Sequence, residues 1–325
     1  FVRARRDRLV VEFVDPDDED ADEPVGLPST DAADRRTIRD VALATDGSRE
    51  DLALVVAALE RVEARVAADA WAGIKERISA EMSSPEFWAS DERFARLGVV
   101  EYQDRIEAGL RTARSVLGRI SDSDRDRIAG HLLGRLALRT HLLEVAVRDV
   151  LEARPHDSFL SIDAAQESDE GRAWATRLSD MYAAWAATRN MRLDELDSSG
   201  APATDTRRVW AVSGYGAHSL LAGEHGLHVL ELPLDTGHSF QRIHARVRVV
   251  PQPPAPPRAE GETLASQAHS ALHREGREES NIVRRYRESP SPLVRDTSGW
   301  KTGLIDRVFA GNFDLFAVGD PQGAP

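Results

Sequence analysis

Two runs of apolar residues at helical spacing, separated by a short acidic break, constrain the fold of this chain more than any other feature. The first run advances by four and three positions and comprises Ile106, Leu110, Ala113, Leu117 and Ile120. After SDSD at residues 121–124, the second run comprises Ile128, Leu132, Leu136, Leu143, Val147 and Val150. A stripe with this period buries one face of a helix. The break therefore predicts two long helices that pack antiparallel.

Cap residues predict where other helices of this region begin. Ser48 with Asp51 three positions later has the pattern of a capping box, and apolar residues follow it at helical spacing. We expect one long helix over about residues 49–80. Ser84 followed by Pro85 predicts a second helix start, because proline suits the first helical turn. Pro155 should end the helical region, so we expect a helical domain over 48–155.

The hydrophobic period then changes from helical spacing to alternation, which predicts an α+β domain over 156–251. The expected helix covers residues 168–189, and the expected strands are 158–164, 191–197, 207–213, 226–234 and 244–250. PQPPAPP at residues 251–257 cannot continue a sheet, because proline has no ladder donor. We expect an exposed linker over 252–262. A polar helix near 262–280 and an apolar tail that docks back should fill residues 263–325.

The first 47 residues are predicted to form a strand remnant and a linker. Residues 8–14, RLVVEFV, have the composition of a short strand. DPDDEDADEP follows and repels itself in any compact state, and it lacks the glycine and spacing of a calcium loop. The chain begins with Phe1 rather than methionine, so we expect further sequence before it.

Composition excludes several classes of function. The formal net charge is −13, so no global basic field draws this chain to DNA or RNA, and an RNA contact requires a local patch. There is no cysteine, and neither of the two lysines follows a glycine, which excludes thiolate metal sites and the phosphate-binding loop. No apolar run has membrane-spanning length, and the start FVRARRDR lacks the basic-then-apolar layout of a signal peptide. We expect a cytoplasmic protein with no cofactor, no metal, no membrane and no DNA partner.

Four segments in order resemble the bacterial class I peptide-chain release factors, in particular the type that reads UGA as well as UAA. They are MSSPEFWASDERFARLGVVEYQDRIEAGL (82–110), WATRLSDMYAAWAATRNM (174–191), GEHGLHVLELP (223–233), and IVRRYRESPSPLVRD through AGNFDLF (282–316). The resemblance implies a helical first domain and a central α+β domain that reads the codon. It also implies a C-terminal segment that docks on the central domain.

The departures from the family pattern concern hydrolysis and codon reading. The family's Gly-Gly-Gln loop needs a glycine pair, and this chain contains no Gly-Gly dipeptide. PQPPAPPRAEGETLASQAH stands where most of the catalytic domain would be, so we expect no enzyme activity. Leu232-Pro233-Leu234 replaces the Ser-Pro-Phe tripeptide whose serine contacts the codon. Gln241-Arg242 replaces a His-Thr pair, so stop-codon specificity should be absent or altered.

Candidate RNA-binding residues remain in the predicted central domain. Glu170 occupies the position of a family glutamate at the recognition helix. In QRIHARVRVV the residues Ile243, Ala245, Val247 and Val249 should face inward, and His244, Arg246 and Arg248 should share the outer face. That face is either a phosphate-contacting stripe or an ordinary solvated strand face. Glu224, His225 and His228 offer three metal-ligand types, but their spacing suits a helix and the segment has the pattern of a strand.

Two interpretations of function follow. In the first, this is a release-factor-like protein that binds the A-site region of the ribosome through rRNA, hydrolyses nothing, and has a regulatory, protective or adaptor role. In the alternative, the fold has become a module that binds another protein, as part of a larger multidomain chain.

Overall fold

The structure is a computed structural model that describes residues 2–5, 8–11, 36–44, 46–121, 129–196, 207–234, 239–257, 263–274 and 281–316. The chain divides into two compact units, Phe1–Arg36 and Thr37–Pro325. The first contains an antiparallel hairpin of β1 (Val2–Arg5) and β2 (Arg8–Val11). The sequence predicted β2 but missed β1, which is short and has the composition VRAR. The acidic run at 15–24 lies outside the described residues.

The helical region of the second unit contains six helices within the described residues. They are α1 (Ile38–Leu43), α2 (Arg49–Val66), α3 (Asp69–Glu81), α4 (Pro85–Ala89), α5 (Glu92–Ser121) and α6 (Gly130–Leu151). The predicted capping box is confirmed, because the Asp51 N–H donates to Ser48 Oγ (3.0 Å) and the Ser48 N–H donates to the Asp51 carboxylate (3.2 Å). The cap at Ser84 with Pro85 in the first turn is also confirmed.

The prediction of one helix over residues 49–80 is wrong. α2 ends at Val66, and Ala68 has extended backbone (ψ 150°) before α3 begins at Asp69. The apolar stripe of α2 stops there, and the turn brings Trp71 to α5, where its indole N–H donates to Glu107 (3.0 Å). A tertiary contact therefore breaks the helix that local spacing would continue.

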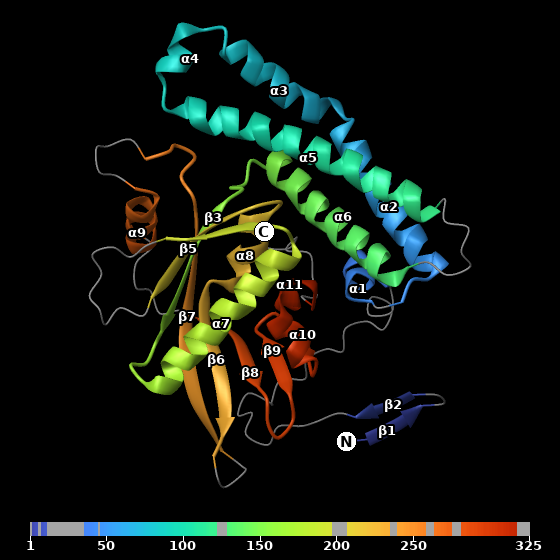
Figure 1. The fold of residues 1–325 in the computed structure, drawn as a ribbon, viewed down its shortest axis with the longest axis vertical. Coiled ribbons are helices and arrows are strands. Elements are labelled where there is room, and N and C mark those ends of the chain that lie inside the picture. Colours follow the sequence, from blue (N-terminus) through green and yellow to red (C-terminus); the bar gives the residue numbers. More distant parts are fainter. Residues whose placement is uncertain are drawn as a thin grey trace. The chain divides into compact units, whose positions relative to one another are not determined.

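The long helices α5 and α6 pack antiparallel, as the apolar stripes predicted (Figure 1). The buried residues of the two stripes are Ile106, Leu110, Ala113, Leu117, Leu136, Leu143, Val147 and Val150. Leu132 was predicted in the second stripe but is 39% exposed, and Leu133 is buried instead because it has the phase of the contact face. Ile128 lies outside the described residues.

Within its described residues, the second unit also contains one sheet of eight strands, in the order β10-β9-β8-β6-β7-β3-β5-β4. The strands are β3 (Ser158–Ala164), β4 (Arg192–Glu195), β5 (Arg208–Ser213), β6 (Gly226–Pro233), β7 (Phe240–Pro251), β8 (Ile282–Arg287), β9 (Leu293–Asp296) and β10 (Lys301–Thr302). β8 runs parallel to β6, and the other pairs are antiparallel. The α+β fold class is thereby confirmed.

Helices cover the sheet unequally on its two faces. α7 (Asp169–Thr188) crosses one face and buries Trp174, Tyr182 and Trp185 in the main core (Figure 1). α9 (Leu264–Arg274) packs against part of the other face, where Ala268 and Leu272 join a small cluster with Phe159, Ala211 and Val250. The predicted polar helix near 262–280 thus has its described part at α9. The rest of that second face carries charged residues.

The C-terminal segment docks on the sheet, as predicted. Trp300 is 5% exposed, and Phe309 is half-buried with its ring stacked on Tyr286 (centroids 5.6 Å apart). Beyond the prediction, the segment contributes β8, β9 and β10 to the sheet edge, and its described part continues through α10 (Ile305–Arg307) and α11 (Phe313–Phe316). Within the described part of the chain, no helix combines the length and apolar composition needed to cross a membrane. The predicted domain boundaries stay predictions.

Candidate functional site

The end of the β6–β7 hairpin brings together five candidate residues that stand at the family's codon-reading positions. In the register of the two strands, Leu232 lies opposite Gln241, while Pro233 and Arg242 lie on the adjacent pairs. Leu234 follows β6, is 45% exposed, and its N–H donates to the Ser239 carbonyl (2.9 Å). The side chains of Leu232, Pro233 and Leu234 carry no hydrogen-bond donor or acceptor, so they have no means to pair with a base edge.

Glu170 lies in the first turn of α7, with an exposed side chain. The loop before this helix is fixed to β7, because the Ala165 N–H donates to the His244 carbonyl (3.0 Å) and Gln166 Nε2 lies 3.3 Å from His244 Nδ1. Ser168 caps the helix by accepting from the Gly171 N–H (3.0 Å). These contacts therefore hold the start of α7 against β7 at His244.

The alternation predicted for β7 is confirmed. Its inward residues Ile243, Ala245, Val247 and Val249 are buried in the main core. His244, Arg246 and Arg248 lie on the opposite face and are half-buried. Arg246 and Arg248 each donate to the Asp163 carboxylate on β3, at 3.3 Å. The stripe is therefore not a bare solvated strand face, because a carboxylate on the neighbouring strand orients it.

The tail strands extend this charged face across the sheet. On β8, Arg285 lies opposite Val229 of β6 and Arg287 opposite Glu231, and Arg295 of β9 lies opposite Arg285. We use the name basic sheet face for the six arginines Arg242, Arg246, Arg248, Arg285, Arg287 and Arg295. Three of them lie on tail strands and were missed from the sequence. The alternation in IVRRYR and LVRD was the available signal, but their place beside β6 depends on a non-local pairing.

Two carboxylates lie among the six arginines. Asp163 accepts from Arg246 and Arg248, and Glu231 accepts from Arg295 (3.3 Å) and lies 3.7 Å from Arg285. Each carboxylate is therefore shared between two guanidinium groups. Burial lowers the pKa of His244, and the charges of Arg242 and Arg285 lower it further, so the imidazole lies in a positive local field.

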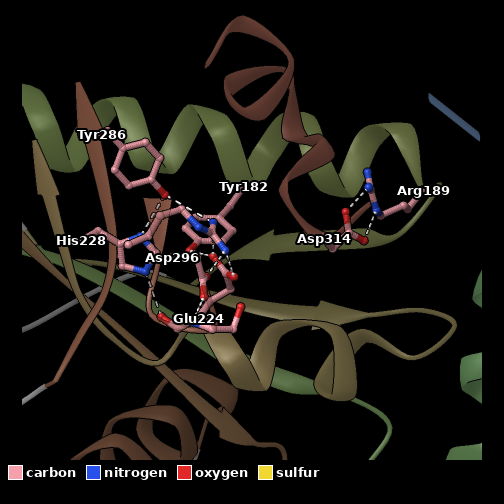
Figure 2. Close-up of polar contacts among 9 residues, drawn as sticks. Tyr182, Arg189, Glu224, His228, Tyr286, Asp296 and Asp314 are labelled. Atoms are coloured by element: carbon pink, nitrogen blue, oxygen red, sulfur yellow. Dashed lines mark hydrogen bonds and ion pairs between the residues drawn. The ribbon is translucent and has the colours of Figure 1, made fainter. Parts of the chain in front are cut away.

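A second polar cluster lies on the opposite, buried face (Figure 2). Arg284 donates to both carboxylate oxygens of Glu224 (2.7 and 2.9 Å), and the Tyr182 hydroxyl donates to the same carboxylate (3.0 Å). Arg284 also contacts Asp296 at 3.3 Å. Burial raises the pKa of Glu224, while the guanidinium of Arg284 acts in the opposite direction. The cluster connects α7, β6 and the tail strands, so its contacts fix the tail to the sheet.

His228 belongs to this cluster as a neutral imidazole, since burial lowers its pKa to about 3. Its Nε2 lies 3.0 Å from the Glu224 carbonyl, which can only accept, so Nε2 carries the proton. Nδ1 then accepts from the Tyr286 hydroxyl (3.0 Å). With Glu224 bound by Arg284, the carboxylate and the imidazole are both occupied by protein groups. Among the described residues, no group of three or more His, Cys, Asp or Glu could hold a metal ion.

A third polar cluster joins the helical region to the sheet. The Tyr102 hydroxyl on α5 accepts from the Gly216 N–H (2.8 Å), and the Tyr102 ring stacks on His156 with centroids 4.0 Å apart. Asp149 on α6 is buried and accepts from the Ser219 hydroxyl (2.7 Å). Burial raises the pKa of Asp149 to about 6 and lowers that of His156 to about 4. These contacts are structural, because they join α5 and α6 to the segment that precedes β6.

Comparisons with known proteins address the ancestry of this arrangement. A family model described as PCRF domain matches residues 74–245, just over half of the chain. Among solved structures, RF2 of Thermus thermophilus matches at 17% sequence identity and a TM-score of 0.41. That match covers 79% of this chain and 97% of the other.

Proposed function

Because the chain belongs to the PCRF-domain family of release-factor-like, translation-related proteins, we propose that it is a ribosome-binding member that releases no peptide and has no stop-codon specificity. It would act in the cytoplasm, where it occupies the A-site region of the ribosome. There it would have a regulatory, protective or adaptor role rather than a hydrolytic one.

The connection between β7 and β8 is the observation that carries this proposal. It spans residues 252–281, only thirty positions, and its described helix α9 packs on the sheet through Ala268 and Leu272. A separate hydrolytic domain with a Gly-Gly-Gln loop has no length of chain from which to form here. These 325 residues also contain no glycine pair to give such a loop its backbone geometry.

The end of the β6–β7 hairpin supports the proposed lack of stop-codon specificity. Base recognition in RNA requires donors, acceptors or stacking side chains placed against the bases. Leu232, Pro233 and Leu234 supply none of these, and Arg242 opposite Glu231 supplies a charge suited to phosphate rather than to one base. Binding would therefore be independent of the codon.

A release assay and a sedimentation assay together test the proposal. Purified protein is mixed with ribosomes that carry a peptidyl-tRNA and a stop codon, with a genuine release factor as positive control. The protein should sediment with 70S ribosomes from its own cell lysate and release no peptide above the buffer background. Peptide release at a tenth of the control rate would refute the non-hydrolytic role. Sedimentation in a ribosome-free complex would support the alternative, a protein-binding module.

A further inference from the structure

We propose that the basic sheet face binds the phosphate backbone of RNA without reading its sequence, and that the C-terminal tail strands supply half of the contacts. This rests on the proposed function, because the RNA in question is that of the ribosome. The surface lies on the face of the sheet opposite α7, and it extends from β7 through β8 to β9.

The strand register gives the arginines a regular spacing. Residues on one face of a strand repeat about every 6.6 Å, and neighbouring strands lie about 4.8 Å apart. Arg242 and Arg246 therefore lie along β7, while Arg285 is displaced from them across β6 onto β8. The guanidinium groups form an extended array over neighbouring strands, which suits a row of phosphates rather than one small anion.

The local charge is positive although the whole chain is acidic. Among the described residues of this face, the six arginines of the basic sheet face have two carboxylate neighbours, Asp163 and Glu231. The ordering contacts are 3.3 Å or longer, outside the range of strong charge-assisted hydrogen bonds (about 2.7–2.9 Å). Asp163 and Glu231 thus orient Arg246 and Arg285 only at these long distances, and Arg242, Arg246 and Arg285 supply positive charge that suits a phosphate backbone.

The side-chain types favour phosphate over bases and over protein. Arginine presents a rigid fork of donors that matches phosphate geometry. Gln241 points to the other side of β7, and Gln166 has its amide engaged by His244 (3.3 Å), so neither amide is presented as a reader of base edges. Phe240 is half-buried next to the array, and the Arg287 guanidinium lies 5.2 Å from its ring centroid. That aromatic ring can stack on any base, which adds affinity without sequence preference.

Three substitutions test the surface with little change to the core. The variant carries Arg242→Gln, Arg246→Gln and Arg285→Gln, one change on an exposed residue and two on half-buried ones. A matched control carries Arg61→Gln, Arg65→Gln and Arg111→Gln, three exposed arginines of α2 and α5 with the same change in net charge. Thermal melting verifies folding. If the triple variant does not fold, the single variant Arg242→Glu takes its place, because Arg242 is exposed at the strand pair next to the hairpin end.

Binding is measured by fluorescence anisotropy with a labelled oligouridylate of about 20 nucleotides, longer than the ~4–16 nucleotides that one compact domain covers. The triple variant should bind at least about tenfold more weakly than the wild type, and the control variant about as well. Each phosphate contact contributes about 0.7 to the salt slope on single strands, so the slope should decrease by about 2. An unchanged affinity and slope in a folded variant would overturn the proposal.

The same proteins are then compared in ribosome pelleting at two salt concentrations. If the wild type and the triple variant pellet equally with ribosomes, the basic sheet face is refuted as the RNA contact, while the proposed ribosome binding is kept. If the wild type binds the oligouridylate through this face but never pellets with ribosomes, the surface stands and the proposed function is wrong. An oligocytidylate of equal length should bind within about threefold of the oligouridylate. A larger preference would contradict sequence-independent binding.

Discussion

Arg284 and Glu224, sixty positions apart in the chain, form a buried bidentate ion pair at 2.7 and 2.9 Å. Their side chains are 3% and 7% exposed. The pair connects β8 to the turn before β6, and β6 and β8 run parallel in the sheet. A second buried pair, Arg189 with Asp314 (2.9 Å), fixes the end of α7 to α11 (Figure 2). The C-terminal segment is therefore held by charge as well as by apolar packing.

Breaking the first pair should destabilise the protein strongly. Arg284→Met leaves the Glu224 carboxylate buried without its cation, which costs about 3–5 kcal/mol of unfolding free energy. The double variant Arg284→Met/Glu224→Leu removes both charges and should recover much of that loss. Urea unfolding of both single variants and the double variant measures the coupling. Simple additivity of the two single effects would show that the ion pair does not hold the tail.

Substituting two glycines with positive φ should distinguish the free-energy cost of backbone strain from that of close packing. Gly311 (φ +85°) lies against α7, and an added Cβ would overlap the backbone nitrogen of Trp185. Gly299 (φ +93°) has nothing within 4 Å of that position. Gly299→Ala should cost about 1–2 kcal/mol from strain alone. Gly311→Ala should cost about 1–3 kcal/mol more, because the obstructing atoms are backbone that cannot rotate away. Equal losses on chemical denaturation would show that the tail does not contact α7 so closely.

Stability should decrease on acidification through two histidines that the fold holds neutral, half-buried His156 and buried His228. The pKa of His156 is lowered to about 4 and that of His228 to about 3, whereas an unfolded histidine titrates near 6.5. Below pH 6.5 the unfolded chain binds protons that the folded chain rejects, so the unfolding free energy decreases by at most about 1.4 kcal/mol per pH unit for each histidine. His156→Phe keeps the stacking on Tyr102 and should flatten the profile between pH 6.5 and 4.

Asp149 should act with the opposite sign. Its folded-state pKa is raised to about 6, so the stability it contributes is complete below its unfolded pKa and is lost as pH rises through 6. Asp149→Asn removes this opposing contribution, and the decrease of stability on acidification should become steeper. Urea unfolding at several pH values between 7 and 4 compares both variants with the wild type. A flatter profile for Asp149→Asn would contradict this assignment.

Codon choice should not affect ribosome binding. With no side-chain donor at Leu232, Pro233 or Leu234, affinities for ribosomes with UGA, UAA or a sense codon in the A site should agree within about threefold. A preference of tenfold, about 1.4 kcal/mol, would reveal a recognition element other than these residues. Competition binding on ribosomes programmed with each codon gives the comparison.

The features predicted from sequence are those encoded locally. The caps at Ser48 and Ser84 and the inward alternation of β7 depend on residues within a few positions, so their patterns identify them. The break at Ala67 and Ala68 was not predictable, because it depends on the contact of Trp71 with α5. Exposed Leu132 shows the same limit, since a heptad pattern does not fix which of two neighbouring leucines meets the partner helix.

Only part of the basic sheet face could be predicted from the sequence, for a related reason. Arg246 and Arg248 follow from the alternation along one strand. Arg285 and Arg295 join them only because β8 pairs in parallel with β6 across a connection of about fifty residues, and no local pattern specifies that pairing. The ion-pair partner of Glu224 could not be predicted either. The sequence indicated its acidic side chain and neighbouring histidines but not the distant arginine.

The late position of β8 has a consequence for how the protein is made. A ribosome synthesises β6 and β7 long before Ile282, so the nascent sheet passes through a stage in which one side of β6 has no hydrogen-bonding neighbour. Open strand edges recruit other strands and promote aggregation. A chain cut short before residue 282 would keep that edge permanently, and Glu224 and His228 beneath it would lose their cover. Synthesis of the segment from Ile282 onward is thus what gives the open side of β6 its hydrogen-bonding neighbour.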